Sequence, residues 1–377
     1  MSTDVAAHSL STTEIPVPLL DVSRSNTPLR DEILSAITRV IDSGAFVLGP
    51  ACQDLEATVA AKCQTKYGIG CASGSDALLL ALMALEVGPG DEVIVPSFTF
   101  FATASAVWRL GATPVFVDID ENRLTLDPAA VRSAITTRTA AIIPVHLYGQ
   151  AADLTALSQL AAQHNLALIE DCCQAHLATY QGRAVGTFGH GCAFSFYPTK
   201  NLGALGDGGA ACTNDAGLAE RIRSLRNGGM SKTSYHEHTG INSRLDELHA
   251  AVLRAKLPFL SEWTTKRRRL AARYREQLCG QTVTLLPEID PGHVYHLFPI
   301  KTTQRESLRE HLGSLGIDTV VHYPTPLPEQ PAFKRDAAGI YPIAEQICGE
   351  IVSLPLHPAL PDESIDRVIQ SVIDFAR

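Results

Sequence analysis

Short apolar runs alternate with amphipathic stretches of helical period between Tyr67 and Leu225. This pattern is typical of strands that alternate with helices, and it predicts a mostly parallel sheet with helices on both faces. The expected strands cover residues 67–71, 93–95, 114–117, 140–144, 166–169 and 192–196, and the expected helices between them cover 76–85, 102–110, 128–134 and 153–164. The alternation therefore places the chain in the α/β class.

The chain has 377 residues, which is more than a domain with a single hydrophobic core usually contains, so we expect two subdomains. A helical region at 29–63 precedes the alternating segment, and a long helical pattern runs from Arg244 to Leu278. Further strands are expected at 294–300 and 319–323, and further helices at 306–315 and 362–375. We predict a flexible tail over 1–15, a large domain over 16–243, and a linking helix with a smaller α/β domain over 244–377.

Composition argues against several classes of protein. A net charge of −9 disfavours general affinity for nucleic acid, and no apolar run reaches the ~18 residues that a membrane helix needs. Residues 1–15 lack the basic start and apolar core of a signal peptide. The nine cysteines contain no C-x-x-C pair, which indicates reduced thiols rather than a disulfide framework or a zinc site. We expect a cytoplasmic protein without a metal ion, and neither nucleic acid nor a membrane as a partner.

A lysine in a glycine-rich loop is the first candidate for chemistry. Lys200 comes shortly after the apolar run 192–196, so it would lie in the glycine-rich loop that follows a strand. Such a loop can pass close to a ligand. A lysine held there can form a Schiff base with the aldehyde of pyridoxal phosphate (PLP). The alternative is a solvated loop lysine, and the motif alone does not decide between the two.

Asp171 is the second candidate, because it follows the apolar run 166–169 and so stands at the carboxyl end of a strand. Open α/β sheets place their ligand chemistry at that end. PLP works as an electron sink only while its ring nitrogen is protonated, and a carboxylate within ~4–6 Å favours the protonated form. Gln174, three residues further on, can hydrogen-bond the phenolic oxygen of the same cofactor. The alternative for Asp171 is a helix N-cap.

Small residues lead from the strand-like run 67–71 into an apolar helix, and Gly74 and Ser75 stand at this junction. The free backbone N–H groups at a helix N-terminus and the helix dipole both favour an anion such as a phosphate. Ordinary helix capping explains a Gly-Ser turn equally well. The phosphate-binding interpretation is favoured because this junction begins the series of strands and helices that also contains Asp171 and Lys200.

These segments, taken in order, resemble the DegT/DnrJ/EryC1/StrS family of PLP-dependent sugar aminotransferases from about Pro16 to the C-terminus. Further similar segments lie at 42–44, 48–50, 88–100, 144–149, 240–247 and 322–324. The loop 200–209 and the segment 242–247 are most similar to nucleotide-linked 3-keto-6-deoxyhexose 3-aminotransferases. The resemblance implies a fold-type I PLP-dependent transferase, with a large PLP-binding domain, a smaller C-terminal α/β domain and active sites at the interface of a homodimer.

The resemblance also implies roles at the cofactor. Lys200 would form the Schiff base and move the proton between the alpha carbon and the cofactor, while Asp171 would hold the ring nitrogen. Gln174 would contact the phenolic oxygen, and Phe100 would stack on the ring unless it is a core residue. Three small residues would hold the phosphate, namely Gly74, Ser75 and Ser195.

Four more residues acquire roles at the substrate and the partner subunit. Asn242 would reach the phosphate of the neighbouring subunit, with Arg244 beside it as a substrate contact, whereas the alternative is that both cap a helix of their own chain. His322 and Tyr323 would line the sugar site, and their alternative is a strand end before a proline turn. The chain departs from the common family pattern at Asp207, Pro328 and Gly228.

The resemblance implies transfer of an amino group, with L-glutamate as the expected donor, onto carbon 3 of a nucleotide-linked keto-deoxysugar. The same reaction at carbon 4 is the alternative, since only the sugar pocket would differ. A PLP-dependent dehydratase on this scaffold would carry histidine in place of Lys200. A PLP-binding regulator without catalysis would need neither Asn242 nor the pair His322 and Tyr323.

Overall fold

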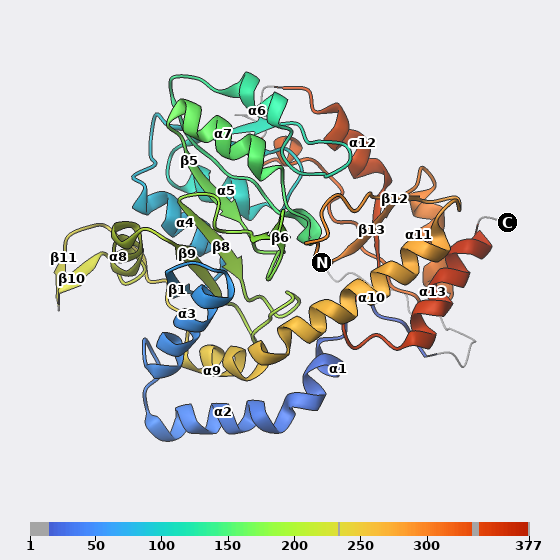
Figure 1. Cartoon of the computed structure of the whole chain (residues 1–377), viewed down its shortest axis with the longest axis horizontal. Coiled ribbons are helices and arrows are strands. Elements are labelled where there is room, and N and C mark those ends of the chain that lie inside the picture. Colours follow the sequence, from blue (N-terminus) through green and yellow to red (C-terminus); the bar gives the residue numbers. More distant parts are fainter. Residues whose placement is uncertain (1–14, 233, 334–338, 376–377) are drawn as a thin grey trace, which may run out of the picture.

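The computed structural model describes residues 15–232, 234–333 and 339–375. The expected N-terminal tail therefore lies outside the described residues except for Ile15. The larger part of the molecule surrounds one central sheet, and the long helix α10 (Leu260–Leu278) leads away from it to a smaller part that carries the C-terminus (Figure 1).

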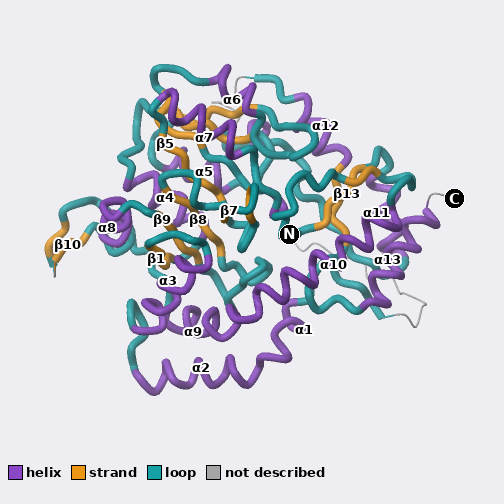
Figure 2. The backbone as a smooth tube through the Cα atoms, in the orientation of Figure 1, coloured by secondary structure: helices purple, strands orange, loops and turns teal. Residues whose placement is uncertain are grey.

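A seven-stranded sheet forms the centre of the larger part (Figure 2), in the order β1-β9-β8-β5-β4-β2-β3. Its strands are β1 (Tyr67–Cys71), β2 (Glu92–Pro96), β3 (Thr113–Val117), β4 (Thr139–Ile142), β5 (Ala167–Asp171), β8 (Gly191–Ser195) and β9 (Gly209–Thr213). All neighbours pair in parallel except β9, which runs antiparallel to both β1 and β8. The expected α/β fold with a mostly parallel sheet is confirmed. The apolar-run pattern did not indicate β9, whose Gly-Ala-Ala-Cys-Thr sequence lacks large branched side chains.

Helices cover both faces of this sheet, because alternate side chains of its strands enter different cores. In β2, Val93 and Val95 join the core on the face of α4, whereas Ile94 joins the core beneath α6 and α7. The helices of the larger part are α1 (Val22–Asn26), α2 (Arg30–Ser43), α3 (Pro50–Lys62), α4 (Gly74–Ala84), α5 (Ala102–Arg109), α6 (Pro128–Ala134), α7 (Leu154–His164), α8 (Ala216–Leu225) and α9 (Glu247–Lys256).

In the smaller part, two helices share a core with a three-stranded antiparallel sheet, whereas a third helix, Pro342–Glu350, buries its apolar residues in the core of the larger part. Its elements are β12 (Thr284–Leu285), β13 (Phe298–Lys301), β14 (Ile351–Leu354), α11 (Arg305–Ser314), α12 (Pro342–Glu350) and α13 (Asp362–Phe375), with α10 against α13. The strand expected at 319–323 is wrong, since only Val320 forms a bridge, with Ser353. The helical pattern of 244–278 is interrupted by a 3-10 turn at Leu257–Phe259, where Pro258 lacks an N–H donor. The domain boundary at 243 stays a prediction.

Two short hairpins complete the fold. One joins β6 (Thr179–Tyr180) to β7 (Arg183–Ala184), and the other joins β10 (Met230–Lys232) to β11 (Tyr235–His236). The second hairpin projects from the body of the molecule beside α8 (Figure 1). It precedes the segment that carries Asn242 and Arg244.

All nine cysteines are free thiols, and seven of them are buried, while Cys173 is half-buried and Cys279 is exposed. Most of the thiols therefore lie in the interior. This agrees with the expectation of reduced thiols, which was drawn from the absence of C-x-x-C pairs. None of the helices within the described residues combines the length and the apolar character needed to cross a membrane.

Candidate active site

A cavity of about 480 Å³ lies where the carboxyl ends of β5 and β8 meet the N-terminus of α4. Parallel strands end at the same edge of a sheet, so Asp171 from β5 and Ser195 from β8 reach this cavity together. Nine of the eleven residues singled out in the sequence line it, namely Gly74, Ser75, Phe100, Asp171, Gln174, Ser195, Lys200, His322 and Tyr323. Asn242 and Arg244 are not among the lining residues.

Asp171 is buried with 5% of its surface exposed, and two hydrogen bonds fix its carboxylate. The Thr103 hydroxyl donates to Oδ2 at 2.9 Å, and the Cys173 backbone N–H donates to Oδ1 at 3.1 Å. Both oxygens accept a hydrogen bond, and their remaining lone pairs are available to a further cationic N–H donor. The carboxylate is therefore oriented by its own chain and able to hold a protonated ring nitrogen.

Lys200 lies in the loop after β8, and its backbone N–H donates to Tyr197 O at 2.9 Å. Burial lowers the pKa of its ammonium below the ordinary value, while the neighbouring Cys173 and Asp171 oppose that change. Because a neutral amine is the nucleophile, the lowered pKa favours attack on an aldehyde. The arrangement unites a nucleophilic amine and an oriented carboxylate in one cavity.

Two glycines bring the backbone of this site close together. A Cβ atom on Gly74 would lie 2.7 Å from Ser195 Cβ and 2.8 Å from Cys173 Sγ. A Cβ atom on Gly209 would lie 2.6 Å from the Gly74 nitrogen. Only glycine permits this approach, which sets the Ser195 hydroxyl beside the first turn of α4. Backbone N–H groups, a hydroxyl and a helix N-terminus together form a donor set that suits a phosphate monoester.

One side of the cavity is formed where the larger part of the chain contacts residues 322 and 323 of the smaller part. Gln174 Oε1 accepts a hydrogen bond from the Tyr148 backbone N–H at 2.7 Å, and its Nε2 donates to the Tyr323 hydroxyl at 3.1 Å. His322 Nδ1 lies 3.0 Å from Ser353 Oγ, and the Tyr148 hydroxyl donates to the His322 carbonyl. The ring of Phe100 lies 6.1 Å from that of Tyr323. These contacts place His322 and Tyr323, the residues expected at the substrate, next to Gln174 and Phe100, the residues expected at the cofactor.

Comparison with known proteins decides which family this constellation belongs to. The family model of the DegT/DnrJ/EryC1/StrS aminotransferase family matches residues 28–373. The chain is a member of this family. It is 48% identical to the UDP-N-acetyl-3-dehydro-alpha-D-glucosamine 3-aminotransferase of Acidithiobacillus ferrooxidans, a match that covers 93% of this chain and 96% of the relative. It is 49% identical to the dTDP-3-amino-3,4,6-trideoxy-alpha-D-glucose transaminase of Streptomyces venezuelae, with 96% of each chain covered.

Solved structures agree with this assignment. The crystal structure of DesV from S. venezuelae in complex with a ketimine intermediate superposes with a TM-score of 0.94 at 48% identity, covering 97% of this chain and 99% of that one. Other solved relatives hold pyridoxamine phosphate. The predicted PLP cofactor is thereby confirmed for the family, and the Gly74 cradle, Asp171 and Lys200 suit its phosphate, ring nitrogen and aldehyde.

Asn242 and Arg244 lie outside the cavity of their own aminotransferase chain. Asn242 forms an antiparallel bridge with Asn227, and Arg244 Nη1 donates to Asn227 Oδ1 at 3.0 Å. The N-cap of α9 is Asp246, so neither residue caps that helix. These two residues lie on a strand-like segment after the β10–β11 hairpin. Ser243 between them accepts the Ala72 N–H at 3.1 Å and donates to Asp76 at 2.8 Å, so the segment runs beside the start of α4.

Sequence reasoning missed two residues of the aminotransferase site. Thr103 orients Asp171 from the first turn of α5, and no local feature of the sequence indicated this contact. His296 lines the cavity, is 4% exposed, and its Nδ1 lies 3.1 Å from Asn201 Oδ1. His296 belongs to the run 294–300 that was interpreted only as a strand, so nothing local distinguished it from a core residue.

One group of possible metal ligands occurs in the described part of the chain, formed by His146, Glu170 and Cys172. The Glu170 carboxylate already accepts backbone N–H bonds from Gly186, Phe188 and Gly189 at 2.6 to 3.0 Å. His146 Nε2 lies 3.1 Å from Glu170, and the Ala152 N–H donates to Nδ1 at 3.2 Å. Because Nδ1 accepts the Ala152 hydrogen bond, Nε2 is the ring nitrogen that donates to Glu170, whose carboxylate then has four hydrogen-bond donors.

The close approach at Gly74 leads to a prediction about cofactor binding. Gly74→Ala should weaken PLP binding about 10- to 100-fold, since overpacking of ~1–3 kcal/mol pushes Ser195 and Cys173 into the cradle. Titration of the apoprotein with PLP, followed by the absorbance of the bound cofactor, measures this loss. Gly88→Ala is the control, because a Cβ atom there meets nothing within 4 Å. Equal PLP affinities of Gly74→Ala and Gly88→Ala would contradict the prediction that the backbone around Gly74 binds the phosphate.

Proposed function

We propose that this chain is a PLP-dependent aminotransferase that places an amino group on carbon 3 of a nucleotide-linked keto-deoxysugar in deoxysugar biosynthesis. The observation that carries the proposal is the pair Lys200 and Asp171 at one cavity, with Asp171 oriented by Thr103 and by the Cys173 backbone. Two relatives whose names specify a 3-amino product or amination at carbon 3 support carbon 3 over carbon 4. Lysine at position 200, in place of histidine, supports amino transfer over dehydration.

PLP bound here would supply an electron sink for the carbon that gains or loses the amino group. Asp171 would keep the ring nitrogen protonated, and Thr103 would hold that carboxylate in the required orientation. Lys200 would take the proton from the substrate carbon and return it, because its lowered pKa leaves a larger neutral fraction. Gly74, Ser75 and Ser195 would bind the phosphate, and His322 and Tyr323 would orient the sugar.

The active site would be shared between the two chains of a homodimer. Two aromatic side chains at the cavity, Phe100 and Tyr197, are 55% and 50% exposed in one chain, and a second copy would bury them. Asn242 and Arg244 lie outside their own cavity and so are free to serve that of the partner. There, Asn242 would meet the phosphate, and the Arg244 guanidinium would meet a carboxylate or phosphate of the substrate. We expect L-glutamate as the donor and the cytoplasm as the location.

Mixing two inactive variants tests the shared site. Lys200→Ala subunits mixed equally with subunits that carry Asn242→Ala and Arg244→Ala should regain about a quarter of wild-type activity, because half of the dimers then contain one intact pocket. The control mixes Lys200→Ala with Asp171→Asn subunits. Both of these defects belong to the pocket of their own chain, so no pocket becomes intact. Equal activity of the two mixtures, after mass spectrometry has shown subunit exchange, would refute the shared site.

The substrate class is tested with a panel of dTDP- and UDP-linked 3-keto and 4-keto deoxysugars, with L-glutamate as donor and mass detection of the amino sugar. We expect turnover with 3-keto compounds at least about 100-fold faster, in kcat/KM, than with 4-keto compounds, since a misplaced carbonyl forfeits the orientation that proximity catalysis needs. Preference for 4-keto compounds would move the reaction to carbon 4. Absence of turnover by a cofactor-loaded protein, with every compound, would favour a regulator.

A further inference from the structure

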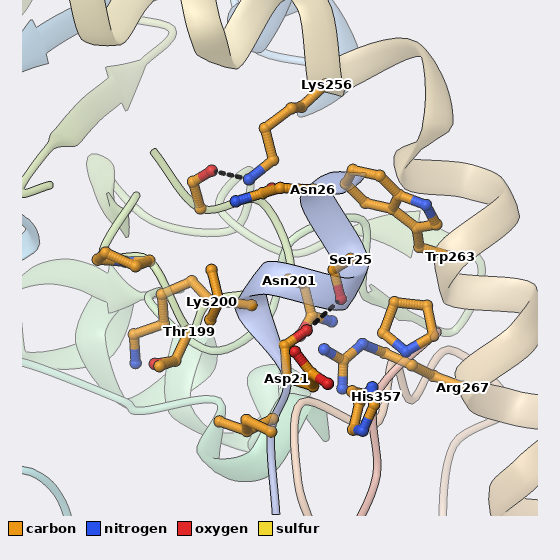
Figure 3. A pocket seen from close by; sticks show the side chains of 15 residues that line it. Asp21, Ser25, Asn26, Thr199, Lys200, Asn201, Lys256, Trp263, Arg267 and His357 are labelled. Carbon is orange, nitrogen blue, oxygen red and sulfur yellow. Dashed lines mark hydrogen bonds between the residues drawn. The ribbon is translucent and has the colours of Figure 1, made fainter. Parts of the chain in front are cut away.

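A second cavity, of about 40 Å³, lies behind the loop that carries Lys200, between α1 and the helices α9 and α10 (Figure 3). The close view shows Lys256 of α9 ending beside Asn26 of α1, whereas Arg267 of α10 lies beside His357 and Asp21. Thr199 and Lys200 line both this cavity and the active-site cavity, so the loop forms a partition between the two. Apart from Lys200, no polar side chain that lines the smaller cavity takes part in the cofactor or substrate contacts described above.

Two buried cations face this cavity without a carboxylate partner. Lys256 is 4% exposed, and its ammonium donates to the Gly203 carbonyl at the end of the Lys200 loop. Arg267 is also 4% exposed, and its Nη1 donates to the carbonyls of Tyr295, His296 and Leu356 at 3.0 to 3.2 Å. No carboxylate of residues 15–232, 234–333 or 339–375 lies within 4 Å of either cation. Buried charges of this kind are costly unless they are neutralised.

Unpartnered polar atoms border the same space. His357 is 3% exposed, and neither of its ring nitrogens has a hydrogen-bond partner within the described structure. The Nε atom of Arg267 is likewise buried without a partner. A buried donor left without an acceptor costs roughly 1–3 kcal/mol. Burial lowers the pKa of His357 to about 4, so its neutral ring has one N–H donor, which joins the Arg267 Nε–H in favouring a group able to receive hydrogen bonds.

The charge balance favours an anion over a cation. Asp21 is the acidic residue that lines the cavity, and its carboxylate already accepts the Arg24 N–H at 2.8 Å and lies 3.5 Å from the Arg24 guanidinium. Lys256 and Arg267 therefore remain in excess. Burial lowers the pKa of Lys256 to about 8 and that of Arg267 to about 10, which is the response of cations that lack a counterion.

We propose that this cavity binds one small monovalent anion, of the size of chloride or formate, beside the Arg267 guanidinium and the His357 ring, with Lys256 as the second cation of the cavity. A cavity needs roughly 10–15 Å³ in this measure to hold one water molecule, so about 40 Å³ admits a small ion and excludes a nucleotide or a sugar phosphate. The anion stabilises the packing of the Lys200 loop against α9, since the ammonium that it neutralises also holds the Gly203 carbonyl. This site is independent of the substrate proposed above.

Thermal unfolding of the PLP-loaded protein tests the site without reference to activity. Sodium chloride should raise the Tm by several degrees along a saturating curve, whereas sodium gluconate at equal ionic strength should not, because the gluconate ion is too large to enter. Formate should act as chloride does if the site accepts any small monovalent anion, and only chloride should act if the site selects halides. Coincident curves in chloride, formate and gluconate would overturn the proposal.

Variants locate the effect. Lys256→Met should abolish the difference between chloride and gluconate, while Lys266→Met, which removes an exposed lysine on α10, should retain it. If Lys256→Met fails to fold, His357→Leu serves the same comparison. Crystals of the wild-type holoprotein grown with bromide should show an anomalous peak in this cavity, beside the Arg267 guanidinium and the His357 ring. Retention of the chloride effect in Lys256→Met or His357→Leu, or water alone at that position in the bromide crystals, would refute the anion site.

Discussion

Lys200→Ala is expected to lower the turnover of the PLP-loaded protein by at least about 10³-fold and to eliminate the covalent attachment of the cofactor. The physical reason is that, in the proposed function, this lysine would supply both the amine that is joined to the cofactor aldehyde and the base that moves the substrate proton. One positioned base alone contributes roughly 10²–10⁴-fold. The fold should persist, since the side chain points into a cavity rather than into a core.

Borohydride reduction of the wild-type holoprotein, followed by peptide mass analysis, should place a pyridoxyl group on Lys200. Lys62→Ala is the matched control, because that lysine is exposed at the end of α3 and should leave both labelling and turnover unchanged. A pyridoxyl group found on another lysine of the wild-type protein, or turnover that persists in Lys200→Ala, would remove Lys200 from its proposed role.

Asp171→Asn is expected to lower turnover by about 10- to 1000-fold while the protein still folds and binds PLP. A neighbouring carboxylate shifts the pKa of its partner by ~1–3 units, and loss of that charge lowers the protonated fraction of the ring nitrogen by the corresponding factor. The asparagine side chain keeps the shape of aspartate and can still accept the Thr103 hydrogen bond. The expected defect is therefore electrostatic rather than structural.

Absorbance of the bound cofactor as a function of pH separates these causes, since the ring nitrogen should lose its proton at a lower pH in Asp171→Asn than in the wild type. Asp54→Asn is the control, because Asp54 is an exposed carboxylate paired with Arg254. Thr103→Val removes only the orienting hydroxyl and should cause a smaller loss than Asp171→Asn. An unchanged pH profile together with normal turnover would exclude Asp171 from the mechanism.

Glycine motifs and strand ends made it possible to predict from the sequence that Lys200, Asp171 and Gly74 lie at one site. Lys200, Asp171 and Gly74 are each recognisable within about ten residues of sequence, because a strand, its end and the following turn are local features. Parallel pairing then carries these ends to one edge of the sheet without further information. Resemblance to a known family extended the prediction to Gln174, Ser195, His322 and Tyr323, all of which line the cavity.

The tertiary structure alone decided which distant residues support these groups. Thr103 and His296 carry no local sign of their contacts with Asp171 and Asn201, since each hydrogen bond joins segments more than sixty residues apart. The small strand β9 and the irregular segment 319–323 also depended on their neighbours, because their own side chains favour no regular structure strongly. The pairing of Lys256 and Arg267 around one cavity arises in the same way, from a helix, a loop and α1 that meet only in the folded chain. Periodicity in a sequence thus determines elements and their ends, whereas hydrogen bonds and buried charges are determined by what the packing of those elements brings into contact.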